Sequence, residues 1–125
     1  MTNFETLQRV VLAEAWDAID VDNADKAQFL LHAFDVFDVV IDDQHLTYTN
    51  RQNAVSEHIA NRFSMQARIP FLLDSLHQHF TASDLDYLAG DLIDALVEAE
   101  MLLTAANNAF KEHIVVNGGG VRITR

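Results

Sequence analysis

The sequence predicts an all-α protein: a compact bundle of about five helices, followed by a short extended C-terminal tail. Apolar residues recur every three or four positions through most of the first 113 residues, which is the period of a helix with one buried face. Short polar breaks containing asparagine, serine or threonine separate these segments, and such residues cap helix N-termini. The segment 24–43 is apolar around most of its circumference, so it is predicted to be a central helix with neighbours on several sides.

The length and composition indicate one globular domain over residues 1–125, with a helical bundle at 1–113 and a tail at 114–125. Cysteine is absent, which excludes disulfides and thiolate chemistry and makes a reducing cytoplasm the default compartment. The N-terminus lacks the basic region of a signal peptide. No apolar run approaches the roughly 20 residues that a membrane-spanning helix needs. We therefore expect a soluble, cytoplasmic protein.

The first two helices are predicted to pair. The first runs from about Asn3 to Ile19, and Thr2 or Asn3 can cap it. A short polar break ends in Asn23, which is a suitable N-cap for the central helix. A turn this short places two helices side by side in antiparallel orientation.

The middle of the chain is predicted to hold two shorter helices. The segment 42–50 loses the helical period and contains a short run with β-strand character at 46–49. Asn50 can cap a third helix over 51–66. Pro70 is the only proline, and because its ring disrupts helix interiors it predicts a break and a fourth helix over 70–80.

The last helix is predicted to be the longest and to pack alongside the central one. Ser83 can cap it, Asp84 and Asp86 suit its first turn, and the periodic pattern continues to about His113. The tail 114–125 has an asparagine and three glycines between β-branched runs, which is the composition of a β-hairpin.

The large aromatic side chains are assigned mainly to the core, because they supply most of the buried area of a small bundle. Any that remain exposed would line a groove or a dimer interface. The residues are Trp16, Phe29, Phe34, Phe37, Phe63, Phe71 and Phe80.

The formal net charge is -11, and it is unevenly distributed. Residues 1–50 hold ten acidic and two basic side chains, and residues 81–125 hold seven and three. The segment between them is weakly basic through Arg51, Arg62 and Arg68. This charge disfavours direct binding to nucleic acid and to anionic membranes, and it favours basic protein surfaces or metal cations.

Two helices carry the same polar pattern, D-x-x-D-x-x-x-[DE], which keeps three carboxylates on one stripe of a helix. We interpret both stripes as solvated faces that bind a protein partner with a basic surface. The candidate partner-binding residues are Asp35, Asp38 and Asp42 on the central helix and Asp91, Asp94 and Glu98 on the last helix.

If the two stripes instead faced each other, their carboxylates would need a cation such as Mg²⁺ or Mn²⁺. The ligands would be Asp35, Asp38, Asp91, Asp94 and Glu98. This alternative resembles the all-α nucleoside triphosphate pyrophosphatases, the MazG-like enzymes, which bind Mg²⁺ through an E-E-x-x-E helix and an E-x-x-D helix. Asp91 and Asp94 match the second element, and the first would be read into Asp38, Asp42 and Asp43, although this chain has aspartates where that family has glutamates. The resemblance implies Mg²⁺-dependent hydrolysis of nucleotides.

The histidines have no assigned role. Asp42 with His45, and Asp74 with His77, share the i, i+3 spacing that ferritin-like di-iron bundles use as Glu-x-x-His, and His79 follows closely. His32 lies one turn before Asp35, where it can be a proton carrier or a structural hydrogen-bonding group.

Three functions remain open from the sequence. The first is a non-enzymatic binder or inhibitor of a basic partner, which by analogy of size and charge is typical of phage-type inhibitors and immunity-like proteins. The second is the Mg²⁺-dependent pyrophosphatase. The third is a structural subunit that forms homodimers or larger oligomers through its phenylalanine-rich faces.

Overall fold

The structure is a computed structural model that describes residues 2–45, 56–80 and 88–113, and all of its described elements are helical. They are α1 (Phe4–Asp20), α2 (Ala24–Gln44), α4 (Ser56–Ser75), the 3-10 helix η1 (Leu76–Gln78) and α5 (Leu88–His113). The all-α prediction is confirmed. The described residues form four α-helices, however, where five were predicted.

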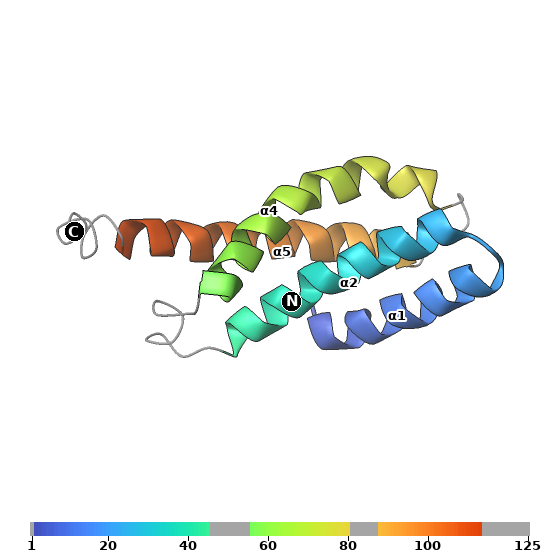
Figure 1. Cartoon of the computed structure of the whole chain (residues 1–125), viewed down its shortest axis with the longest axis horizontal. Coiled ribbons are helices and arrows are strands. Elements are labelled where there is room, and N and C mark those ends of the chain that lie inside the picture. Colours follow the sequence, from blue (N-terminus) through green and yellow to red (C-terminus); the bar gives the residue numbers. More distant parts are fainter. Residues whose placement is uncertain (1, 46–55, 81–87, 114–125) are drawn as a thin grey trace.

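The predicted pair of N-terminal helices is confirmed, with both caps as expected (Figure 1). The Asn3 side chain accepts a hydrogen bond from the Thr6 N–H at 3.0 Å, and the Asn23 side chain accepts one from the Lys26 N–H at 3.2 Å. Between the helices Asp22 has a φ of 57°, a left-handed conformation that aspartate tolerates better than most residues. This tight turn holds α1 antiparallel to α2.

The predicted break at Pro70 is wrong. The segments expected to form a third and a fourth helix are one helix, α4, which continues through Pro70 to Ser75. Four apolar side chains at helical spacing on both sides of the proline are buried, and they favour a continuous helix: Met65, Ile69, Leu72 and Leu76. Pro70 itself is exposed, so water can reach that side of α4.

Replacing Pro70 by alanine is therefore expected to stabilise the protein. Alanine restores the N–H that can bond to the Gln66 carbonyl, and it is favoured over proline in a helix interior by roughly 3 kcal/mol. The substitution also raises the conformational entropy of the unfolded chain, which costs about 0.4–1 kcal/mol of stability. We therefore expect the free energy of unfolding to rise by about 2 kcal/mol. Urea unfolding followed by circular dichroism measures it. A lower midpoint for Pro70→Ala would mean that the fold needs the geometry that the proline imposes.

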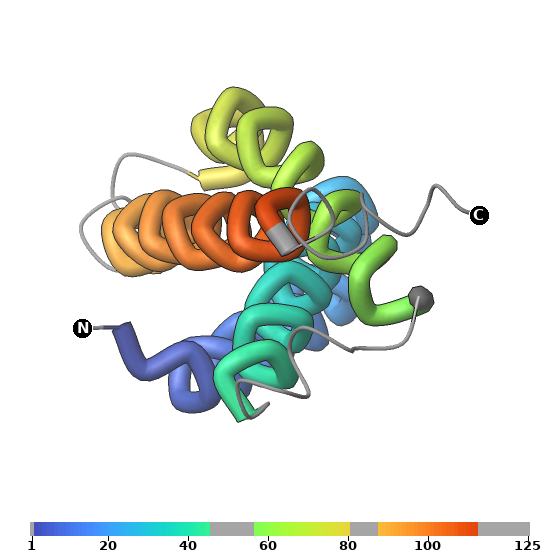
Figure 2. Tube along the Cα trace, turned by 90° about the vertical axis from the view of Figure 1, so that its left-hand side faces the viewer, coloured from blue at the N-terminus to red at the C-terminus, as the bar shows by residue number. Residues whose placement is uncertain are grey.

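The central position of the second helix is confirmed, because α2 packs against α1, α4 and α5. Figure 2 shows α5 between α4 and the α1–α2 hairpin. The core fills the space between these helices, and its large, fully buried side chains include Leu30, Phe37, Ile69, Leu92 and Leu96. α5 lies beside α2 as predicted, and it also packs along α4.

The assignment of the large aromatic residues mainly to the core holds for some of them and not for others. Phe29, Phe37 and Phe80 are buried, but 61% of Trp16 and 75% of Phe71 are exposed. Trp16 lies on a side of α1 away from the buried stripe of that helix, and Phe71 follows Pro70 on the outer side of α4. Periodicity identifies the buried stripe of a helix, but it does not decide where the flanking residues point.

Several predictions fall outside the described residues. They are the loop and extended piece before α4, the cap and first residues of the third helix, the cap of the last helix, and the β-hairpin at 114–125. Within the part of the chain that the structure describes, no helix is both long enough and apolar enough to cross a membrane.

Candidate functional site

The three carboxylates predicted on the central helix lie on one exposed face of α2. Asp35, Asp38 and Asp42 are all exposed, and the buried residues of the helix point the other way. The Asp38 side chain accepts a hydrogen bond from Gln8 Nε2 of α1 at 3.1 Å. Asp35 Oδ2 lies 3.7 Å from Arg68 Nη1 of α4. The α2 carboxylates therefore lie on a face that is flanked by α1 and α4.

The second stripe lies beside α1, at a cavity of about 540 Å³ between α1 and α5. Asp91 and Asp94 are exposed there, and Glu98 is half-buried. Glu98 Oε1 accepts hydrogen bonds from the N–H and the hydroxyl of Thr2 at 3.1 and 2.8 Å. Glu98 thus has a structural role, because it holds the chain that leads into α1.

The structure does not bring the two stripes together. The α2 stripe contacts Gln8 of α1 and Arg68 of α4, whereas the α5 stripe borders the start of α1 and contacts Thr2. Within residues 2–45, 56–80 and 88–113, no group of three or more histidine, aspartate or glutamate side chains could hold a metal ion. Among these residues, neither the predicted Mg²⁺ or Mn²⁺ ligand set nor a histidine-based site is formed.

Three of the histidines that the sequence analysis singled out lie near groups on another element. His45 Nε2 is 3.8 Å from Glu5 Oε1, and both side chains are exposed. His32 and His79 line a shallow cavity of about 350 Å³ between the start of α2 and the end of α4. The ring of His79 packs against Phe29, with 4.8 Å between the ring centroids.

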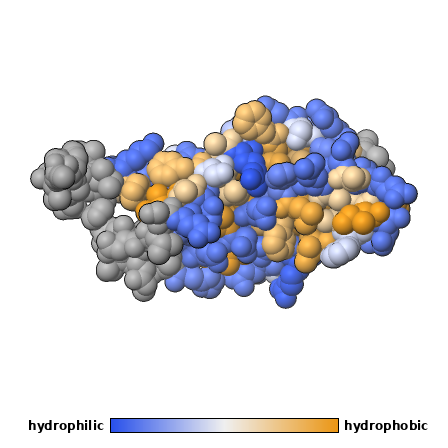
Figure 3. Space-filling view, viewed as in Figure 1, coloured by the Kyte–Doolittle hydropathy of each residue, from blue (hydrophilic) through white to orange (hydrophobic). Residues whose placement is uncertain are grey.

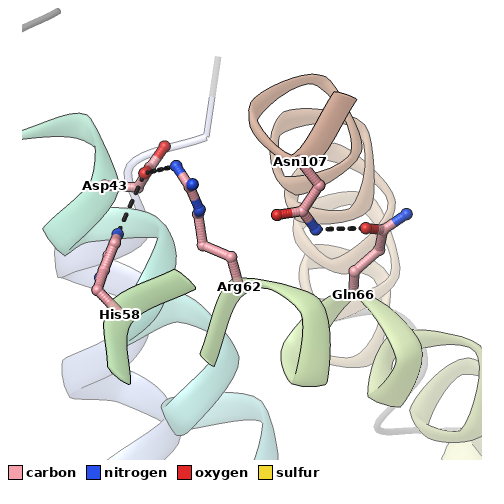
Figure 4. A network of polar contacts seen from close by, with 5 residues as sticks. All are labelled: Asp43, His58, Arg62, Gln66 and Asn107. Carbon is pink, nitrogen blue, oxygen red and sulfur yellow. Dashed lines mark hydrogen bonds and ion pairs between the residues drawn. The ribbon is translucent and has the colours of Figure 1, made fainter. Parts of the chain in front are cut away.

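A buried charged cluster joins α2 to α4, and sequence reasoning missed it (Figure 4). Arg62 is fully buried, and its Nη1 donates a hydrogen bond to Asp43 Oδ1 at 2.9 Å. His58 Nε2 lies 3.2 Å from the same oxygen. Since an arginine remains charged at any ordinary pH, the Asp43 carboxylate compensates a charge that has no access to water.

A second set of side-chain hydrogen bonds joins α4 to α5. The Asn107 side-chain amide donates a hydrogen bond to Gln66 Oε1, and Gln66 Nε2 donates one to Thr104 Oγ1 at 3.0 Å. Figure 4 shows His58 and Arg62 reaching α2, whereas Gln66 reaches α5. Both clusters tie α4 to its neighbours, so we assign them to the architecture of the bundle.

The sequence does contain a signal for the charged cluster. His58 and Arg62 are four residues apart within the apolar period of their helix, which places both on its buried face. A buried arginine requires a carboxylate. Two adjacent aspartates end the central helix, and only the packing of α4 decides that Asp43 points inward while Asp42 stays exposed.

No family model, no curated protein and no solved structure matches this chain.

Proposed function

We propose that this protein is a non-catalytic helical module that binds a basic surface on a protein partner through the α2 carboxylates, as an inhibitor or adaptor does. The observation that carries the proposal is the exposure of Asp35, Asp38 and Asp42 along one stripe of α2. At 1.5 Å per residue, the stripe presents three negative charges over about 10 Å of a rigid helix.

The charges around this stripe favour the same conclusion. Residues 1–50 carry ten acidic side chains against two basic ones, so the α1–α2 hairpin is strongly negative. Arg68 of α4 forms an ion pair with this stripe, and its Nη1 lies 3.7 Å from Asp35 Oδ2. The two atoms are too far apart for a hydrogen bond, and 61% of the Asp35 side chain remains exposed, so the pair leaves most of the negative potential available to a partner.

The proposal predicts a large effect of removing the three α2 charges. The variant Asp35→Asn/Asp38→Asn/Asp42→Asn is expected to weaken partner binding by about tenfold or more at low salt, or about 1.4 kcal/mol, mainly through slower association. The partner is first captured by zero-length cross-linking of its lysines to the carboxylates of this protein, and mass spectrometry then identifies it and the cross-linked residues. Its affinity for the purified proteins is then measured by calorimetry at two salt concentrations.

A matched control removes three exposed carboxylates elsewhere. The variant Glu57→Gln/Asp74→Asn/Glu112→Gln, whose three carboxylates lie on α4 and α5, has the same net charge as the α2 variant, and it is expected to bind within about twofold of the parent protein. If both triple variants lost the same affinity, only net charge would matter. If Asp91→Asn/Asp94→Asn weakened binding and the α2 variant did not, the docking face would lie on α5. Either result contradicts the proposal.

A further inference from the structure

The face that carries the α2 carboxylates also carries an exposed apolar patch, which we call the hairpin patch. It consists of Leu12, Trp16 and Ile19 of α1 and Leu31 of α2. Their exposed fractions are 37%, 61%, 45% and 40%. Residues 12, 16 and 19 are spaced by four and three positions, so they form one stripe along α1. Figure 3 shows apolar surface over the hairpin, next to hydrophilic surface.

One hydrogen bond fixes how the hairpin patch and the carboxylates adjoin. Gln8 Nε2 donates to Asp38 of α2, and Gln8 lies one turn before Leu12 on the same stripe of α1. Leu31 lies two turns before Asp38 on the same stripe of α2. Because the helices are antiparallel, both apolar stripes extend from the Gln8–Asp38 contact toward the turn. The apolar patch and the carboxylates therefore form one continuous face.

From this face we infer that the partner docks a cationic amphipathic helix, with its apolar side on the hairpin patch and its lysines or arginines against Asp35 and Asp38. The inference rests on the proposed function and specifies the partner's chemistry. Amphipathic helices insert an apolar stripe between two neighbouring helices, and flanking charges set their orientation. An elongated patch along two helices, with acidic residues at one end, matches both features.

The charge also argues against a second copy of this chain as the occupant. Each copy has a net charge of -11 and would bring its own α2 carboxylates to the interface. Like charges brought together at an interface oppose pairing. A cationic helix meets the same carboxylates with the opposite sign.

Trp16 supplies a direct reporter, because it is the only tryptophan in the chain and lies within the hairpin patch. Three synthetic peptides test the inference. The first is an amphipathic helix with a leucine face flanked by lysines, the second is its scrambled isomer without an amphipathic face, and the third has the same leucine face flanked by glutamates. We expect the first to shift the Trp16 emission to shorter wavelength and to bind about tenfold or more tightly than either of the others.

The outcomes separate the inference from the proposed function. If the scrambled basic peptide bound as tightly as the amphipathic one, the acidic face would still recognise basic partners, but the inferred helix would be wrong. If neither basic peptide bound while the cross-linked partner did, the helix would again be wrong. If sedimentation showed a dimer whose formation shifted Trp16 emission, a second copy would occupy the hairpin patch, and the inference would be overturned.

Two variants locate the binding face. Leu12→Ser/Ile19→Ser keeps the tryptophan and is expected to lower the affinity for the amphipathic peptide by about tenfold. The matched control, Val97→Ser/Met101→Ser, removes two exposed apolar side chains from α5 and is expected to leave the affinity unchanged. Equal losses in both variants would contradict docking on the hairpin patch. Circular dichroism confirms that each variant is folded.

Discussion

Replacing Asp43 by alanine is expected to lower the free energy of unfolding by about 3–5 kcal/mol, because it leaves the buried Arg62 guanidinium without its counter-ion. Arg62 is fully buried, and its Nε and Nη2 already have no hydrogen-bond partner among the described residues. The aspartate is therefore the acceptor on which the arginine depends in this part of the structure. In a domain of this size the loss corresponds to a fall of about 10–20 °C in melting temperature.

The neighbouring aspartate provides the control. Asp42→Ala removes the same group from the next position of α2, but Asp42 is exposed, so the cost should stay within about 0.5 kcal/mol. The double variant Asp43→Leu/Arg62→Met removes both charges and should recover most of the stability, because an apolar pair of similar volume leaves no uncompensated ion. Urea unfolding of the four proteins gives all these values. A loss below about 1 kcal/mol in Asp43→Ala would mean that Arg62 has another source of compensation.

This cluster also bears on the proposed docking face. Asp42 and Asp43 are adjacent on α2, and one carboxylate is presented to solvent while the other is bound to α4. The contact with Arg62 thereby anchors the end of α2 that carries the exposed stripe. Partner binding by Asp43→Ala, measured below its melting temperature, is expected to fall by less than in the triple asparagine variant, because the exposed charges remain.

The second large effect is expected from Phe37→Ala, which should cost about 3–5 kcal/mol. The Phe37 side chain is fully buried at the centre of α2, and its ring lies 5.6 Å from that of Phe4, centroid to centroid. Truncation removes the buried apolar area and leaves a cavity between α1 and α2 that close-packed neighbours fill only in part. Thermal unfolding should show a drop of about 10–20 °C.

The same substitution at Phe71 is the matched control, since 75% of that residue is exposed on α4. Phe71→Ala should change stability by no more than about 0.5 kcal/mol. A large loss there would mean that another molecule covers the outer side of α4 in solution, and it would be concentration-dependent. An equal, concentration-independent cost at Phe37 and Phe71 would contradict the described packing.

Local sequence chemistry was sufficient for the parts of the fold that depend on neighbours along the chain. The helical class, both N-terminal caps and the bounds of α1 and α2 follow from periodicity and from asparagine side chains within three residues of the groups they bind. The grouping of the α2 carboxylates on one stripe follows as well, because a period of 3.6 residues brings them to one side of the helix, but their exposure to solvent is known only from the structure.

Tertiary structure decided the remainder, since those features depend on contacts between helices. Burial of Ile69 and Leu72 carries α4 through Pro70, against the local preference of proline. The packing of α4 on α2 selects Asp43, and not Asp42, as the partner of Arg62. Residues at the edge of a helical face, such as Trp16, become core or surface according to whether a neighbouring helix covers them. The sequence thus determined the helices and their acidic stripe, whereas long-range packing determined which charges are buried and which apolar residues remain available to a partner.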